Sequence, residues 1–359
     1  MNAGIVMNSM TTKGKNDLIS TGHLTTTSDV RSPSAGAHSL RLVIVTMGVT
    51  PIVRPLLRCT HNVVGIIECA PRHYSERESE KSLRRHIKSL YQKITRRPSS
   101  LPDLARKKSI PYYFMTKRNS AELEIWLSAL QPDLIVIFAT SMLLKEHIYS
   151  IPRLGAINLH PSLLPKYRGP NPWMWTYYHA DLRPGVTVHY LDSGEDTGDI
   201  IYQESFDITL GTRLPELYKK AIKDIGTKLL IKSIDSIAQG SAPRIPQPTL
   251  SPTDRARSIS PGEGAQLIDW AHWPIERIWH FINGAERWLK ILPEMRGIYA
   301  AHVWEIGPLE KCSVSGYEPG KFYPGERQPF LACRDGRILL KRRFRVKRLI
   351  AILLNGSKG

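Results

Sequence analysis

Three polar side chains in two short stretches of the sequence can act together on one bond. Asn158 and His160 lie two residues apart in AINLH, and Asp196 lies in the acidic, glycine-bearing turn DSGEDTGD. Because alternate side chains of a strand project from the same face, Asn158 and His160 can reach the same atom. The amide can stabilise an oxyanion, the imidazole can move protons, and the carboxylate can orient the imidazole. This set suits acyl transfer to an amine without a covalent enzyme intermediate.

Short apolar runs predict the strands that must hold these side chains. Residues 40–48 (LRLVIVTMG), 62–68 (NVVGIIE) and 132–140 (PDLIVIFAT) are rich in β-branched residues, which is typical of buried parallel strands. AINLH and GVTVHYLD add two more strands, and the helical patterns PIVRPLLRC and AELEIWLSAL alternate with them. The alternation predicts an α/β fold with a doubly wound, mostly parallel sheet. Pro161 then ends the strand of His160 and begins a loop at the carboxyl end of the sheet, where ligands of such folds collect.

Several other kinds of site are disfavoured by the sequence. The only glycine in the first turn is Gly48, so the GxGxxG pattern of a dinucleotide site is absent. Ser162 lacks the GxSxG elbow of a nucleophile and is interpreted as a loop hydrogen-bonding residue. The four cysteines lack CxxC spacing, which argues against a metal site or a disulfide framework. No stretch approaches the roughly 18 apolar residues of a membrane helix, so we expect a cytoplasmic protein with no membrane partner.

Composition divides the chain into four parts. Residues 1–38 are rich in Ser, Thr, Gly and Asn and are predicted to be a disordered polar tail. Residues 39–240 contain the alternating strands and helices, with a basic helical insertion at about 72–110. Residues 241–260 are rich in proline and serine, as an interdomain linker should be. Residues 261–349 form a second domain, with β-like segments AAHVWEI, PFLAC and RILLKRR.

The formal net charge of +18 is concentrated in two segments. Residues 72–118 contain 14 Lys and Arg against 4 Asp and Glu, and residues 334–348 contain 8 against 1. Such clusters attract polyanions through phosphate contacts and counterion release. A solvated basic surface that only keeps the protein soluble explains the charge equally well.

The stretches NLHPSLLPKYRG (158–169) and GVTVHYLDSGEDTGDII (185–201) resemble the formyltransferases that use 10-formyltetrahydrofolate. The resemblance extends over about residues 40–251. It implies that 10-formyltetrahydrofolate is the co-substrate, that no metal takes part, and that a formyl group passes directly to a primary amine through a tetrahedral intermediate.

The resemblance also implies roles for individual residues. The catalytic residues of the family correspond by motif to Asn158, His160 and Asp196. The implied folate pocket contains Ala139, Thr140, Met142 and Leu143 after the third predicted strand, together with Asp192 and Gly194 of the acidic turn. The loop that flanks substrate and cofactor contains Ser162, Leu163, Leu164, Pro165, Arg168 and Gly169.

The segment GAQLIDWAHWPIERIWHFINGAERW (264–288) resembles the start of the second domain in methionyl-tRNA formyltransferases and in their sugar-directed relatives. This resemblance implies a smaller C-terminal domain like an open β-barrel. We interpret the tryptophans of the segment as packing residues, with a base-stacking platform as the alternative.

The acceptor is predicted to be methionyl-tRNA, whose acceptor-stem phosphates the basic segments 72–118 and 334–348 would contact. Two features depart from the tRNA-directed enzymes. The basic insertion replaces their Gly- and Arg-rich loop after the second strand, and Trp173 directly follows the second proline of RGPNPW. An amino-sugar nucleotide or another small amine therefore stays open as the acceptor.

Two further classes are disfavoured. A non-catalytic nucleic-acid-binding scaffold would have no need of an intact set of Asn158, His160 and Asp196. Hydrolysis of 10-formyltetrahydrofolate uses a similar set, but those hydrolases usually carry an amino-terminal regulatory domain that the polar tail cannot form.

Overall fold

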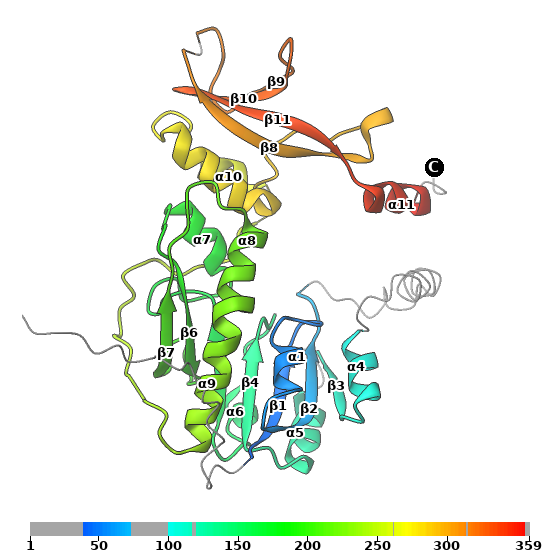
Figure 1. The fold of residues 1–359 in the computed structure, drawn as a ribbon, viewed down its shortest axis with the longest axis vertical. Coiled ribbons are helices and arrows are strands. Elements are labelled where there is room, and N and C mark those ends of the chain that lie inside the picture. The colour runs from blue at the N-terminus through cyan, green and yellow to red at the C-terminus, as the bar shows by residue number, and fades with distance from the viewer. Residues whose placement is uncertain (1–38, 73–99, 117–119, 261, 314, 356–359) are drawn as a thin grey trace, which may run out of the picture. The chain divides into compact units, whose positions relative to one another are not determined.

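The computed structural model describes residues 39–72, 100–116, 120–260, 262–313 and 315–355. Seven strands of this part of the chain form one sheet (Figure 1). In spatial order they are β3 (Tyr112–Met115), β2 (Asn62–Cys69), β1 (Arg41–Thr46), β4 (Leu134–Phe138), β5 (Ala156–His160), β6 (Gly185–Tyr190) and β7 (Ile200–Ser205). Strands β1 to β5 run parallel, β6 runs antiparallel to β5, and β7 runs antiparallel to β6. The predicted α/β class and mostly parallel sheet are confirmed.

The sequence patterns missed the two edge strands. β3 has four residues, of which only the last is buried, and β7 buries only its first two residues. Edge strands of this kind show no apolar run, because one of their sides has no neighbouring strand and much of their surface meets water. The five predicted strands are the central ones, which are covered on both faces.

Helices cover both faces of the sheet. In β1, Leu42 and Ile44 join a larger apolar cluster, and Val43 and Val45 join a smaller one on the other face. Helices α5 (Ser120–Ala129) and α6 (Glu146–Tyr149) contribute to the smaller cluster. The larger cluster includes residues of α1 (Val53–Leu56), α4 (Leu101–Lys107), α7 (Pro172–Tyr178), α8 (Leu214–Tyr218), the π-helical segment η1 (Lys219–Gly226) and α9 (Thr227–Ala238).

A second sheet follows in the C-terminal part of the chain. Its four antiparallel strands are, in spatial order, β8 (His302–Lys311), β11 (Gly336–Phe344), β10 (Phe330–Cys333) and β9 (Phe322–Tyr323). The smaller C-terminal sheet domain expected from the sequence is therefore present. Helix α10 (Ile275–Leu289) contacts this sheet, and Trp279 Nε1 donates a hydrogen bond to the carbonyl of Gly307 at 2.8 Å. The remaining elements are the 3-10 turns η2 (Glu263–Leu267) and η3 (Gly297–Tyr299) and the helix α11 (Val346–Asn355).

Some predicted segments lie outside the described residues. These are the tail, residues 1–38, and most of the basic insertion, residues 73–99. The described end of the insertion includes α4, in which Asp103 N–H donates to the Ser100 side chain at 3.4 Å. Among the residues that the structure describes, no helix has both the length and the apolar content needed to cross a bilayer.

Candidate active site

Strand β5 presents Asn158 and His160 on one face. Ile157 and Leu159 point the other way, into the larger apolar cluster. Ala156 belongs to the smaller cluster on the opposite face. Because side chains alternate along a strand, Asn158 and His160 lie on the face of Ala156.

Asp196 reaches this face through the loop after β6. Strand β6 is antiparallel to β5, with Asn158 opposite His189, so β6 ends beside the start of β5. The loop begins with a hydrogen bond from Leu191 N–H to the carbonyl of Ala156 at 2.8 Å. It then returns toward the middle of β5, and Asp196 adopts a φ of +56°, which residues other than glycine seldom adopt.

The carboxylate of Asp196 joins the predicted catalytic residues. Its Oδ2 lies 3.5 Å from His160 Nδ1, and its Oδ1 accepts a hydrogen bond from Asn158 Nδ2 at 3.4 Å. Gly169, in the loop after β5, donates its backbone N–H to Oδ2 at 2.9 Å. The structure thus brings together side chains that are 36 to 38 positions apart in the chain.

His160 is buried, with 4% of its surface exposed. Its Nε2 lies 3.1 Å from the carbonyl oxygen of Tyr167 and must donate, since a carbonyl can only accept. The lone pair of the neutral ring is then on Nδ1, on the side of Asp196. Burial lowers the pKa of His160, and the Asp196 carboxylate partly opposes that change. The imidazole is therefore neutral at about pH 7 and can accept a proton at Nδ1.

Asp196 is the charged member of the pair. Burial alone would raise the pKa of its carboxyl group, but His160, His189 and the N–H of Gly169 more than offset burial and hold the pKa well below its usual range. The carboxylate is therefore ionised at neutral pH. It can stabilise a positive charge on His160 after proton transfer.

His189 belongs to the same cluster, and the sequence interpretation missed it. Its Nδ1 donates to the carbonyl of Tyr190 at 2.8 Å, which leaves Nε2 free to accept from Asn158 Nδ2 at 3.2 Å. These bonds fix the orientation of the Asn158 amide. His189 is identified by the antiparallel register of β5 and β6, which places it opposite Asn158. No local pattern of the sequence contains that register.

The loop after β5 contains the predicted substrate loop. Ser162 Oγ donates to the carbonyl of Lys166 at 2.7 Å, which agrees with a loop hydrogen-bonding residue. The Arg168 guanidinium donates to Gln247 Oε1 at 2.8 and 3.2 Å and to the carbonyls of Pro248 and Thr249. The guanidinium of Arg168 is therefore hydrogen-bonded within the protein. Between these residues lie Leu163, Leu164 and Pro165, of which Leu164 is buried.

The residues of the predicted folate pocket lie in two loops. Ala139, directly after β4, has a φ of +57°, and Leu143 further along the loop is 74% exposed. In the turn after β6, Asp192 Oδ1 accepts a hydrogen bond from Gly194 N–H at 3.1 Å and so shapes the turn. Their role in binding folate stays a prediction. Thr140 and Met142 lie between Ala139 and Leu143 and are partly buried.

Other candidate sites are weaker. A cavity of about 530 Å³ opens at the start of β5 and includes none of the predicted site residues. Its two arginines already contact carboxylates, Arg153 with Asp133 and Arg244 with Asp199. Within the described residues no group of His, Cys, Asp and Glu is arranged to hold a metal ion, and the four cysteines are not in disulfides.

Comparison with known proteins connects the chain to one group of enzymes. Residues 69–234 match the family described as Formyl transferase. The methionyl-tRNA formyltransferase of Pelotomaculum thermopropionicum is 30% identical over 232 residues, 64% of this chain and 69% of that protein. That of Halothermothrix orenii is 30% identical over 262 residues, 73% of this chain and 80% of that protein. Other curated relatives of this name match over 41% to 64% of their length.

A solved structure has the same fold. The N-formyltransferase from Helicobacter canadensis, solved in complex with folinic acid and dTDP-3-aminofucose, superimposes with a TM-score of 0.54. The match covers 85% of this chain and 100% of that chain, at 18% sequence identity. At this identity the match concerns the fold alone.

Proposed function

The chain belongs to the formyl transferase family, and we propose that it moves the formyl group of 10-formyltetrahydrofolate onto the amine of methionyl-tRNA. Formyl transfer itself follows from the family, whereas the donor, the acceptor and the residue roles are the proposed part. The observation that carries the proposal is the contact of one ionised carboxylate with both Asn158 and His160. Attack of an amine on a formyl carbon creates an oxyanion and a proton to remove, and this cluster offers a group for each.

We assign stabilisation of the tetrahedral intermediate to Asn158. Its Nδ2 donates to His189 Nε2 at 3.2 Å and to Asp196 Oδ1 at 3.4 Å. The longer bond is the one that the oxyanion can replace, while His189 keeps the amide in place. A preorganised donor of this kind typically contributes about 3 kcal/mol to lowering the barrier.

We assign proton transfer to His160. As the amine nitrogen bonds to the formyl carbon, it becomes positively charged, and its proton can pass to Nδ1 of the neutral imidazole. Asp196 Oδ2, 3.5 Å away, stabilises the imidazolium that results. Breaking the bond between the formyl carbon and N10 of the folate then releases tetrahydrofolate, whose N10 takes the proton from His160 and so returns the imidazole to its neutral form.

The proposed position of the folate is between the loop after β4 and the turn after β6. In the first loop, Met142 packs against the smaller apolar cluster, and Leu143 offers an exposed apolar side chain. In the turn, exposed backbone near Gly194 offers hydrogen-bonding groups. The folinic acid named with the Helicobacter canadensis structure supports a folate ligand for this fold.

Methionyl-tRNA is favoured as the acceptor by the names of the matched relatives and by charge. In the described part of the second basic segment, Lys341, Arg342 and Arg345 are exposed on or next to β11. Exposed cations of this kind suit the phosphates of a tRNA stem. The first basic segment lies largely outside the described residues.

An amino-sugar nucleotide is the second candidate. The Helicobacter canadensis protein, solved with such a compound, covers 85% of this chain, including part of its C-terminal region. A diphosphate would also be attracted to arginine and lysine side chains.

The test offers the protein 10-formyltetrahydrofolate with a panel of acceptors and measures the release of tetrahydrofolate. The panel contains methionyl initiator tRNA, the same tRNA without methionine, free methionine, dTDP-amino sugars and no acceptor. We expect release only with methionyl-tRNA. Release only with a sugar nucleotide would support formyl transfer but contradict methionyl-tRNA as the acceptor. Release without any acceptor would indicate a hydrolase.

A further inference from the structure

Residues 245–257, part of the predicted linker, lie along the loop that follows β5, and we call them the strap. Thr253 Oγ1 accepts a hydrogen bond from Tyr167 N–H at 2.7 Å, and Ala256 N–H donates to the carbonyl of Arg168 at 2.7 Å. A connecting segment without a structural role would make few such bonds. The strap therefore supports the substrate loop as well as connecting two parts of the chain.

Within the strap, the side chain of Gln247 hydrogen-bonds both to the acidic turn and to Arg168. Its Nε2 donates to the carbonyl of Asp196 at 3.0 Å and to that of Gly198 at 2.7 Å. Its Oε1 accepts from Arg168 Nε at 3.2 Å and from a terminal nitrogen of Arg168 at 2.8 Å. Both hydrogens and both lone pairs of the amide are thus used. The bond pattern also fixes which end of the amide is the nitrogen.

These contacts hold Asp196 from two directions. Gln247 binds the backbone carbonyl of Asp196 directly, at the residue whose φ of +56° needs outside support. Through Arg168, Gln247 also holds the chain next to Gly169, whose N–H donates to Asp196 Oδ2. Gln247 therefore contacts both the carbonyl of Asp196 and the arginine next to the loop residue that binds its carboxylate, and it touches neither Asn158 nor His160.

We propose that Gln247 is a positioning residue that holds the Asp196 carboxylate at the distance from His160 that formyl transfer requires, an inference that rests on the proposed function. Gln247 does not contact the reacting atoms. It acts by holding Asp196 and the loop of Gly169 in fixed positions relative to each other. Displacement of a catalytic group by about 1 Å can cost up to about 100-fold in rate, so a partial loss of support should lower turnover strongly.

The test compares Gln247→Met with Gln247→Glu. Methionine has a similar length and makes none of the polar contacts, whereas glutamate can still accept from Arg168 but cannot donate to the carbonyl of Asp196. With 10-formyltetrahydrofolate and methionyl-tRNA, we expect kcat to fall about 10-fold in both variants, with KM for each substrate within about twofold of wild type. Wild-type kcat in Gln247→Glu would overturn the proposal, because anchoring Arg168 would then suffice. Wild-type kcat in Gln247→Met would overturn it as well.

Ser251→Ala is the matched control in the strap. It removes the bond of 2.8 Å from Ser251 Oγ to the carbonyl of Pro165 and two bonds to Thr253 within the strap, and it removes no contact to Asp196. We expect its kcat to stay within about twofold of wild type. An equal loss of kcat in Ser251→Ala would show that any loosening of the strap has this effect, and the specific role of Gln247 would be wrong.

A second measurement does not depend on turnover. NMR titration of the His160 imidazole reports the Asp196 carboxylate directly, with His189 and Glu195 as the other titratable groups facing the ring. Because Asp196 favours the charged ring, we expect Gln247→Met to lower the pKa of His160 and Ser251→Ala to leave it unchanged. A wild-type protein inactive with every acceptor would refute the proposed function. An unchanged His160 titration in Gln247→Met would refute the positioning role separately.

Discussion

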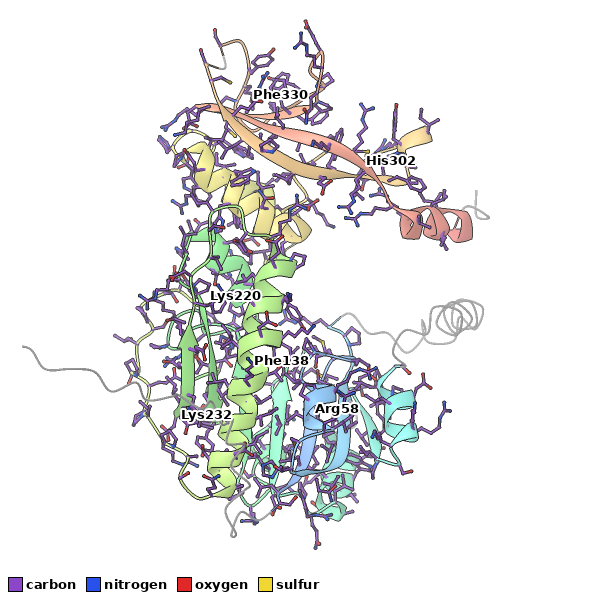
Figure 2. The ribbon with its side chains drawn as sticks, viewed as in Figure 1. Arg58, Phe138, Lys220, Lys232, His302 and Phe330 are labelled. Atoms are coloured by element: carbon purple, nitrogen blue, oxygen red, sulfur yellow. The ribbon has the colours of Figure 1, made fainter. Side chains whose placement is uncertain are left out.

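Two buried histidines in different regions show what separates the proposed catalytic imidazole from a packed one. His160, at the end of β5, is 4% exposed, and His280, in α10, is fully buried. His160 faces the carboxylate of Asp196 at 3.5 Å. His280 accepts a hydrogen bond from Gly211 N–H at 3.0 Å, its ring packs against that of Tyr177, and its Nε2 is buried with no hydrogen-bond partner in the described part of the chain. Figure 2 draws the side chains of the described residues as sticks on the ribbon.

The difference between the two lies in the charge that surrounds them. Burial lowers the pKa of both histidines, and it lowers that of His280 to about 4. Burial alone lowers the pKa of His280, so no carboxylate in the described part of the chain stabilises a proton placed on its ring. At His160 the ionised Asp196 provides that stabilisation. Burial by itself therefore makes an inert histidine, and a buried carboxylate beside it permits proton transfer.

The largest effect should come from removing the histidine that has the carboxylate. We expect His160→Ala, and likewise Asp196→Ala, to lower kcat about 1000-fold, since proton transfer and its electrostatic support are lost together. His280→Gln is the matched control and should keep kcat within about twofold of wild type. The measurement is the release of tetrahydrofolate, with circular dichroism to confirm folding. Equal losses of kcat in His160→Ala and His280→Gln would contradict the distinction between the two histidines.

Asn158→Ala tests the other half of the site. Loss of the proposed oxyanion donor should lower kcat about 100-fold, equivalent to about 3 kcal/mol of barrier. In this variant His160 keeps its hydrogen bond to Tyr167 and its contact with the Asp196 carboxylate. The pKa obtained from its NMR titration should therefore change little. Wild-type turnover by Asn158→Ala would refute the oxyanion role.

The pH dependence of stability should report His280. Its folded pKa of about 4 lies below the value of about 6.5 in an unfolded chain, so the unfolded state binds more protons below pH 6.5. His280 does not affect the free energy of unfolding above about pH 6.5, and it lowers that free energy by about 3 kcal/mol as the pH falls toward 4. Urea denaturation should show a smaller loss over this range in His280→Gln than in wild type. The same loss in both proteins would mean that His280 is not held neutral.

Ser162→Ala should have the smallest effect. Ser162 is buried but donates only to the carbonyl of Lys166 in its own loop and faces no carboxylate. Losing one such bond should cost about 1 kcal/mol of stability and lower kcat no more than about threefold. A loss as large as that of His160→Ala would indicate a nucleophilic serine and would contradict direct transfer.

The sequence alone was enough for the central sheet. Leu134–Phe138 is an apolar run because both faces of a central strand are covered, and this leaves a continuous signal in neighbouring residues. β3 and β7 were missed because they lie at the edges of the sheet and carry no such run. The domain boundaries and the residues of the folate pocket stay predictions.

The sequence by itself also determined that Asn158 and His160 share a face, since alternation along a strand is a local property of the backbone. Only the tertiary structure decided that His189 stands opposite Asn158, that Asp196 returns over the sheet from the end of an antiparallel strand, and that Gln247 supports it. The physical reason is the separation of these residues along the chain. Strand register and bonds between residues 31 to 79 positions apart depend on how the whole chain packs, and no pattern of adjacent residues contains that information.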